Sequence, residues 1–349
     1  MPDPARPPTI ATFPLKSTSY TLQFYAALER LGARVIEGDY SGRWFLRNLR
    51  AIDCFHIHWP SFLYYSPQLR WGSWLRLGKL AVLLLLVRAA GKQVAWTAHN
   101  LYPHDGGAAE LIHRVARRII SRLATHVLVH GSAAGHLVAR EFPVAARKLV
   151  LIEHGHWVGY YANSVTREES RRRLGIPDDG TAYLFLGVCK PYKNLEALIQ
   201  AFLELDGNLY LIIAGKYQSE SYQERIEEMA ALDSARIKLF PGYVDDSEIQ
   251  LFMNACDFVV LSYTEVLTSG SAMLALSFDR PVIAPAIGCL TELVDAEVGV
   301  LYEPGSVAAL GTAMREACRM TFEPGAARRR AEAYSWDRSA RAFLDRLTQ

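Results

Sequence analysis

The feature of this 349-residue chain that most restricts its fold is a regular alternation of short apolar runs with longer amphipathic stretches. A strand buried on both faces of a sheet is a short apolar run, whereas a crossover helix is a longer segment with one apolar face. The alternation therefore predicts βαβ units and parallel sheets. In the first half we expect strands at 9–13, 33–37, 54–58, 93–98, 125–130 and 148–153, and helices at 19–31, 69–90, 108–123 and 132–141.

The pattern restarts after a charged, turn-rich segment at 157–180. Strands are then expected at 182–187, 209–215, 236–240, 257–262 and 281–284, with helices at 193–205, 220–232, 246–254 and 269–278. This predicts an α/β fold of two doubly wound, Rossmann-like domains facing a central cleft, with ligands beyond the carboxyl ends of the strands. The expected divisions are 1–156, 157–335 and a C-terminal helix at 336–349 that packs back on the first domain.

Charge is distributed unevenly between the two halves. Residues 1–158 contain 19 Lys and Arg against 9 Asp and Glu, whereas the remainder contains 19 against 27. A basic first half favours an anionic partner such as a membrane surface or a phosphorylated substrate, and the absence of a nucleic-acid-binding motif argues against nucleic acid. The five cysteines are scattered and odd in number, which indicates reduced thiols in a cytoplasmic protein.

The expected helix at 69–90 contains the run LAVLLLLV, which follows Arg76 and Lys79 and precedes Arg88. Eight apolar residues are far fewer than the roughly 20 that span a bilayer. Two interpretations stay open, a core helix and an interfacial helix with Trp71 and Trp74 at the headgroup level.

Small residues at 268–271 follow the apolar run DFVVLS and precede an apolar helix. Such a turn predicts an anion site, because free backbone N–H groups and the helix dipole meet there. Ser269 or Ser271 would cap the helix. Upstream, Lys190 and Lys193 in KPYKN suit a diphosphate. PGYVDD at 241–246 is expected to contact a nucleobase and to begin a helix capped by Asp245 or Asp246.

In order, FLGVCKPYKN, PGYVDDSEIQLFMNACDFVVLSY and TSGSAMLALSFDRPVIAP resemble the nucleotide-sugar domain of GT-B glycosyltransferases, close to family four. HIHWPSFL, TAHNLYPHD, KPYKN and TSGSAMLALS are also similar to bacterial exopolysaccharide enzymes of the type that includes the xanthan β-mannosyltransferase. By this resemblance, the donor would contact Lys190, Lys193, Tyr243, Val244, Thr268, Ser269, Gly270 and Ser271. Glutamates typical of family four are replaced by Val266 and Leu274, with Glu265 one position away.

Inverting transfer needs a general base opposite the leaving diphosphate. The segment after the expected strand at 93–98 offers three candidates, namely His99, His104 and Asp105, of which Asp105 is favoured. His154 and His156 at the domain junction would lie beside the donor diphosphate. Acceptor contacts are expected from Thr18, Tyr20, His58 and Trp59. His56 and His58 share a strand face, but no third ligand at a defined spacing supports a metal, so no metal or other cofactor is expected.

The resemblance implies an inverting transferase that moves glucuronate or mannose from UDP-glucuronate or GDP-mannose to a polyprenyl-diphosphate-linked oligosaccharide in exopolysaccharide assembly. Such an enzyme would work in the cytoplasm, on the anionic inner face of the bacterial inner membrane. Two alternatives stay open. One is a retaining transferase that uses Glu265, and the other is an inactive sugar-nucleotide-binding partner of another transferase.

Overall fold

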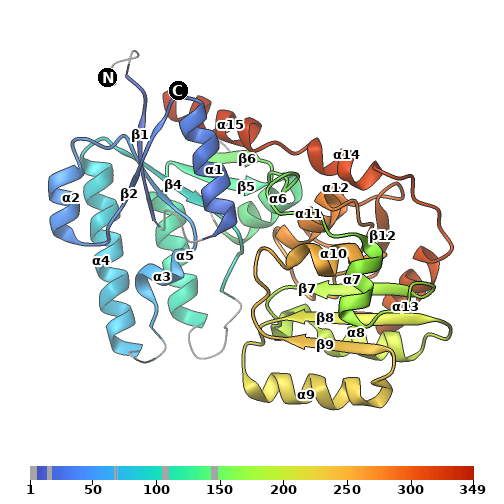
Figure 1. Ribbon diagram of the computed structural model, residues 1–349. Helices are drawn as coiled ribbons and strands as arrows, with labels where there is room; N and C mark the ends of the chain where they lie inside the picture. The colour runs from blue at the N-terminus through green and yellow to red at the C-terminus, as the bar shows by residue number, and fades with distance from the viewer. Residues whose placement is uncertain (1–5, 14–17, 67, 69, 104–109, 143–147) are drawn as a thin grey trace. The chain divides into compact units, whose positions relative to one another are not determined.

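The computed structural model describes residues 6–13, 18–66, 68, 70–103, 110–142 and 148–349. It divides into two compact units, one made of Met1–Gly155 with Ser335–Gln349 and the other of His156–Tyr334. Each unit is built on a six-stranded parallel sheet with helices (Figure 1), as the apolar pattern predicts. The two units meet along the chain after residues 155 and 334, and the sequence-based divisions fall after residues 156 and 335.

In the first unit the strand order is β2-β1-β3-β4-β5-β6. The strands are β1 (Thr9–Phe13), β2 (Arg34–Glu37), β3 (Cys54–Ile57), β4 (Gln93–Thr97), β5 (His126–His130) and β6 (Leu149–Ile152). The helices are α1 (Ser19–Arg30), α2 (Gly42–Asn48), α3 (Ser61–Tyr64), α4 (Arg70–Ala89), α5 (Glu110–Leu123), α6 (Ser132–Glu141) and α15 (Trp336–Thr348). The C-terminal helix α15 packs on α1 and β6, within this unit.

In the second unit the strand order is β12-β11-β10-β7-β8-β9. The strands are β7 (Thr181–Leu186), β8 (Leu209–Gly215), β9 (Ile237–Pro241), β10 (Phe258–Val260), β11 (Val282–Pro285) and β12 (Gly299–Tyr302). The α-helices are α7 (Arg167–Leu174), α8 (Leu195–Leu203), α9 (Glu220–Ala230), α10 (Ile249–Ala255), α11 (Gly270–Ser277), α12 (Leu290–Leu293), α13 (Val307–Ala317) and α14 (Ala326–Glu332). Two short 3-10 helices, η2 (Pro191–Lys193) and η3 (Ala231–Asp233), complete the unit.

Local signals set the ends of several helices. Thr18 caps α1 by accepting a hydrogen bond from the Thr21 backbone, in a reciprocal capping box. Thr166 caps α7, which has Glu168 and Glu169 in its first turn and ends at Gly175 in the left-handed conformation. By contrast, α10 begins at Ile249 with no side-chain cap, so the prediction that Asp245 or Asp246 caps this helix is wrong.

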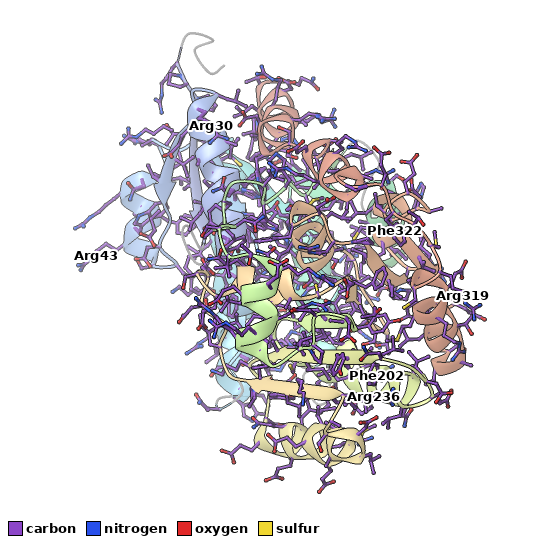
Figure 2. The ribbon with its side chains drawn as sticks, turned by 45° about the vertical axis from the view of Figure 1, so that its right-hand side comes forward. Arg30, Arg43, Phe202, Arg236, Arg319 and Phe322 are labelled. Carbon is purple, nitrogen blue, oxygen red and sulfur yellow. The ribbon has the colours of Figure 1, made fainter. Side chains whose placement is uncertain are left out.

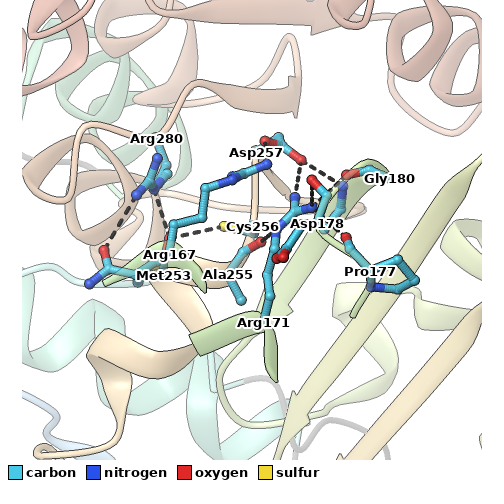
Figure 3. A network of polar contacts seen from close by, with 12 residues as sticks. Arg167, Arg171, Pro177, Asp178, Gly180, Met253, Ala255, Cys256, Asp257 and Arg280 are labelled. Carbon is cyan, nitrogen blue, oxygen red and sulfur yellow. Dashed lines mark hydrogen bonds and ion pairs between the residues drawn. The ribbon is translucent and has the colours of Figure 1, made fainter. Parts of the chain in front are cut away.

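A buried arginine fastens the start of the second unit to its sheet. Arg171 has no exposed side-chain surface and donates to the carbonyls of Ala255, Pro177, Asp178 and Gly180. Its Nη2 also lies 2.8 Å from a carboxylate oxygen of Asp257, directly before β10 (Figure 3). Because these acceptors satisfy the guanidinium at several donor positions, the buried charge is compensated.

Other arginine side chains of the protein pack on aromatic rings or project into solvent. Arg236 lies over the ring of Phe202, with its guanidinium carbon 5.1 Å from the ring centroid (Figure 2). Arg43 on α2 and Arg319 after α13 are exposed and point away from the ribbon.

Candidate active site

The order of the strands in the second unit brings together the two loops that contain the predicted phosphate-binding residues. Connections run from β7 toward β9 on one side and from β10 toward β12 on the other, so the order reverses between β7 and β10. Ligands of doubly wound sheets bind beyond the carboxyl ends of the strands at such a point. The segments that follow these two strands are 187–194 and 261–271, which contain the predicted phosphate-binding residues.

Hydrogen bonds join these two segments. The Ser262 hydroxyl donates to the Lys193 carbonyl at 2.5 Å, and the Thr264 backbone N–H donates to the Tyr192 carbonyl at 2.9 Å. Cys189 links the first segment to the end of β8, because its backbone N–H donates to the carbonyl of Lys216. The ends of β7, β8 and β10 therefore form one framework around Lys193.

Lys193 is buried, with 8% of its surface exposed. Its Nζ lies 5.3 Å from the ring centroid of Phe185 and 5.4 Å from that of Tyr263. It forms no ion pair with a carboxylate among the residues that the structure describes. A buried ammonium group held by aromatic faces and without a carboxylate is suited to an anionic ligand.

Two glycines keep the space beside this ammonium group open. A Cβ at Gly187, which has φ +137°, would lie 3.2 Å from Lys193 Nζ and 3.8 Å from Ser271 Oγ. A Cβ at Gly215 would lie 1.9 Å from the Gly187 carbonyl oxygen, so a side chain there would displace that loop. Gly187 thus marks the place where Lys193 and the first turn of α11 approach each other.

The N-terminus of α11 completes this group. Ser269 caps the helix by accepting from the Ala272 backbone at 3.2 Å, which confirms one of the two expected caps. Ser269 is buried, whereas Thr268, Gly270 and Ser271 are partly exposed. The first N–H groups of a helix have no intrahelical acceptor, so Gly270 and Ser271 add donors and a positive helix end to the Lys193 ammonium.

The first unit contains a separate cluster of polar aromatic side chains after β1, β3, β4, β5 and β6. Tyr20 lies at its centre, because its ring contacts those of His58, His99, His130, His154 and Trp336. The Tyr20 hydroxyl is 2.9 Å from His130 Nε2. His99 is half-buried and stacks on Trp59, with ring centroids 4.5 Å apart.

Burial makes these histidines weak bases. It is the main cause that holds the pKa values of His58, His99 and His130 well below their usual range, and neighbouring histidines act in the same direction. Burial also lowers the pKa of His154 to about 4. The cluster is therefore uncharged near neutral pH. Within the described residues no group of three or more His, Cys, Asp or Glu has the geometry of a metal site.

Comparison with known proteins decides the family. A model of glycosyl transferases group 1 matches residues 166–336. A GDP-mannose:glycolipid 4-beta-D-mannosyltransferase of Xanthomonas campestris pv. campestris is 31% identical over 78% of this chain and 73% of its own length. The chain belongs to the group 1 glycosyl transferases.

Solved structures agree with this glycosyltransferase fold. HepE of Anabaena in complex with UDP matches with a TM-score of 0.72 at 15% identity, over 98% of this chain and 99% of that one. Sucrose-phosphate synthase of Thermosynechococcus elongatus matches with a TM-score of 0.73 at 17% identity, over 97% and 98%. The two-sheet architecture is thus that of GT-B enzymes. The family match and the mannosyltransferase relative together show that the protein is a nucleotide-sugar-dependent glycosyltransferase.

The other predicted donor residues of this glycosyltransferase lie around the same strand ends. Lys190 precedes η2 and is partly exposed, while Glu265 is exposed on the loop after β10. Tyr243 is 73% exposed and Val244 is half-buried, directly after β9. An exposed aromatic ring beyond a strand end is available to stack on a base, and its role stays a prediction.

The predicted acceptor residues of this glycosyltransferase differ in their accessibility. Trp59 is half-buried, but Tyr20 is 6% exposed and His58 has no exposed surface. The burial of His58 leaves no side-chain surface for direct acceptor contact, and the side chain contacts His99 instead. The Thr18 hydroxyl is occupied by the cap of α1. Of the base candidates, His99 is described, whereas His104 and Asp105 lie outside the described residues.

The two junction histidines belong to different units. His154 packs on Tyr20 and Trp336 in the first unit, and its Nδ1 donates to the Gly155 carbonyl. His156 is in the second unit, where its Nδ1 accepts from the Val158 backbone at 3.2 Å. Their roles beside a donor diphosphate stay predictions.

The sequence motifs did not point to Tyr25, His130 or Arg117. Arg117 is 1% exposed and donates to the Leu101 carbonyl and the Asn100 side chain, so it fixes the turn that follows His99. Tyr25 and His130 bond to residues far away in sequence. The one available signal is a shared position near the carboxyl ends of parallel strands, within two residues of the strand end, for Thr12, His56, Thr97, His99 and His130.

Proposed function

We propose that this glycosyltransferase transfers mannose from GDP-mannose to a glycolipid. The observation that supports the sugar, the nucleotide and the acceptor class is the 31% identity to a GDP-mannose:glycolipid 4-beta-D-mannosyltransferase over most of both chains. The anion site of the second unit supports a diphosphate leaving group. Lys193 and the N-terminus of α11 stabilise the departing nucleoside diphosphate, because they direct positive charge to the place where negative charge develops.

The acceptor proposed here is a polyprenyl-diphosphate-linked oligosaccharide, and transfer proceeds with inversion. A base in the first unit removes the proton of the acceptor hydroxyl while the anomeric bond to the diphosphate breaks. Asp105 is our favoured base, because a carboxylate commonly takes this role in inverting sugar transfer and Asp105 stands next to His104 in the sequence. Val266 and Leu274 replace the family-four glutamates, which supports a reaction that does not use them.

The activity is tested with radiolabelled GDP-mannose and UDP-glucuronate, each offered with a lipid-linked oligosaccharide extract. Label from GDP-mannose is expected in the lipid fraction, with the β configuration at the new linkage by NMR. An α linkage would contradict inversion and support the retaining alternative, in which Glu265 takes part. Transfer from UDP-glucuronate but not from GDP-mannose would identify UDP-glucuronate as the donor. Nucleotide binding without transfer to any acceptor would favour the inactive partner.

We also propose that α4 rests on an anionic membrane. No helix in the described part of the chain has the length and apolarity to span a bilayer. Along α4, however, Trp71 is 87% and Leu75 is 78% exposed, and Val82 and Leu86 continue the same face at helical spacing. Arg76, Lys79 and Arg88 border this apolar face, so it is suited to the boundary between acyl chains and acidic headgroups.

Flotation with phosphatidylglycerol and phosphatidylcholine vesicles tests this membrane contact. Leu75→Asp combined with Val82→Asp should abolish binding to phosphatidylglycerol, because two carboxylates would enter the interface. Leu232→Asp is the matched control, since Leu232 is similarly exposed, at 74%, in the other unit. Equal binding to neutral and acidic vesicles, or equal loss with the control, would contradict an anionic docking surface.

A further inference from the structure

A row of hydrogen-bonded side chains crosses the interior of the first unit and ends at His99. Thr97 Oγ1 is 2.8 Å from His56 Nε2, and His56 Nδ1 is 3.1 Å from the Tyr25 hydroxyl. The same hydroxyl is 2.6 Å from His58 Nε2, and His58 Nδ1 is 2.9 Å from His99 Nε2. We call Thr97, His56, Tyr25, His58 and His99 the Tyr25 row.

The Tyr25 row is buried and uncharged. Tyr25 is 3% exposed, and His56 and His58 have no exposed surface. Burial lowers the pKa of His56 to about 3 and raises that of Tyr25. Each imidazole therefore carries one N–H and one lone pair, and Tyr25 carries one hydroxyl proton. The position of one proton in the row then decides the positions of the others.

Two proton arrangements satisfy the row. If Tyr25 donates to His58 Nε2, His58 must donate through Nδ1 to His99 Nε2, and His99 holds its own proton on Nδ1. If Tyr25 donates to His56, the direction reverses and His99 Nδ1 becomes an acceptor. In both cases the Thr12 hydroxyl donates to Tyr25, so this third contact does not select between them.

The lengths of the contacts favour the first arrangement. Hydroxyl donors make shorter hydrogen bonds than N–H donors. The 2.6 Å contact of Tyr25 with His58 and the 2.8 Å contact of Thr97 with His56 suit O–H donors. The 3.1 Å contact of His56 Nδ1 with Tyr25 suits an N–H donor. All these directions agree with a proton on His99 Nδ1.

His99 presents that nitrogen from a fixed ring. Trp59 stacks on the ring at an interplanar angle of 16°, and the Tyr20 ring meets it edge-on with centroids 4.7 Å apart. Among the residues that the structure describes, Nδ1 of His99 forms no hydrogen bond. Packing thus fixes the orientation of the ring, and the Tyr25 row fixes its proton.

We propose that Tyr25 is a positioning residue that acts through His58 to hold His99 as the neutral Nδ1–H tautomer. His99 then donates a hydrogen bond to an oxygen of the bound substrate and is not the general base. This inference rests on the proposed function only for the identity of the substrate. The proton arrangement itself is a property of the protein without substrate.

Ring ¹⁵N NMR of the full chain tests the tautomer without any need for activity. The His99 signal, assigned by its loss in His99→Gln, should show the Nδ1–H tautomer. Tyr25→Phe removes the hydroxyl donor and should produce a mixture of both tautomers at His99. Tyr64→Phe is the matched control, because Tyr64 is also buried and bonded to a histidine, His113, at 2.8 Å. A wild-type Nε2–H tautomer, or a His99 signal unchanged in Tyr25→Phe, overturns the proposal.

Kinetics test the consequence for transfer. Tyr25→Phe should lower kcat about ten-fold or more while KM for the nucleotide sugar changes less than about two-fold. The reason is that His99 in the wrong tautomer no longer donates its hydrogen bond, and this loss raises the energy of the transition state more than that of the bound substrate. Tyr64→Phe should change neither. His58→Asn, which keeps a polar atom near the Nδ1 position, should retain more activity than His58→Leu. Equal kcat in all variants overturns the proposal, whereas an inactive wild type with the expected NMR result contradicts the proposed function alone.

Discussion

Lys193 Nζ lies 3.2 Å from the point at which a Cβ of residue 187 would stand, so Gly187 and Lys193 share the wall of one small space. Ser271 Oγ borders the same space at 3.8 Å from that point. A phosphate that fits there meets an ammonium group, a hydroxyl and a helix N-terminus together.

Gly187→Ala should therefore weaken GDP binding more than it weakens the fold. The new methyl group would occupy the space beside Lys193, and a non-glycine residue at φ +137° would be strained by about 1–3 kcal/mol. Gly207→Ala is the matched control, since Gly207 also has positive φ, +112°, but lies away from the site. Calorimetry should show that GDP binds more weakly to Gly187→Ala than to the wild type, and equally well to Gly207→Ala. Equal affinities in the two variants would place the diphosphate elsewhere.

Lys193→Met should separate binding from stability. We expect GDP affinity to fall roughly ten-fold or more, because a hydrogen bond to a charged group contributes about 1.5–3 kcal/mol. The free energy of unfolding should stay equal or rise, since the ammonium has no carboxylate partner among the described residues. Lys238→Met is the control, because Lys238 is a partly exposed lysine on β9 whose Nζ donates to the Ser234 carbonyl. Calorimetry and urea denaturation measure the two quantities, and an unaltered affinity would make Lys193 a structural residue.

The sequence predicts the strands, turns and helix cap of this region well because their signals are local, whereas the donor contacts stay predictions. The strands end at Leu186 and Val260, turn formers follow within a few residues, and Ser269 precedes a helix, so the prediction of these turns needs only the order of neighbouring elements along the chain. The placement of β10 next to β7 is non-local, but it is the usual order of doubly wound sheets. The strand at Gly299–Tyr302 was missed because it is short and flanked by acidic turns.

The first unit was harder to predict because its polar cluster is built from distant contacts. Alternation along β3 correctly placed His56 and His58 on one face. It could not show that Tyr25 from α1 lies between them, or that Tyr20 reaches His130. These contacts depend on how helices pack on the sheet, which is set by tertiary structure and not by residue spacing.

Arg171→Ala should strongly destabilise the second unit. The guanidinium is fully buried, and its removal would take a hydrogen-bond donor from four carbonyls and from the carboxylate of Asp257 (Figure 3). Breaking a buried charge pair costs about 3–5 kcal/mol. Arg172→Ala, one residue away and 73% exposed in its pair with Glu169, should cost less than about 1 kcal/mol. Urea denaturation of the two variants checks this, and similar midpoints would show that Arg171 is not needed.

Acidification should unfold the first unit before the second. Burial lowers the pKa of His56 from 6.5 to about 3 and that of His154 to about 4, so the unfolded chain binds protons at a higher pH than the folded chain. Stability is therefore complete above about pH 6.5 and falls as the pH decreases toward 4, by several kcal/mol in total.

Hydrogen exchange measured between pH 7 and pH 4, corrected for the intrinsic exchange rate, distinguishes the units. Nine of the ten histidines lie in residues 1–155, and His156 alone lies in the second unit. Amides of β3, β4 and β5 should lose protection first, while those of β7 and β8 keep it. Tyr25→Phe should shift the loss to higher pH, because it removes a hydrogen-bond partner of neutral His56 and His58. Simultaneous loss in both units would show that the buried histidines do not control acid stability.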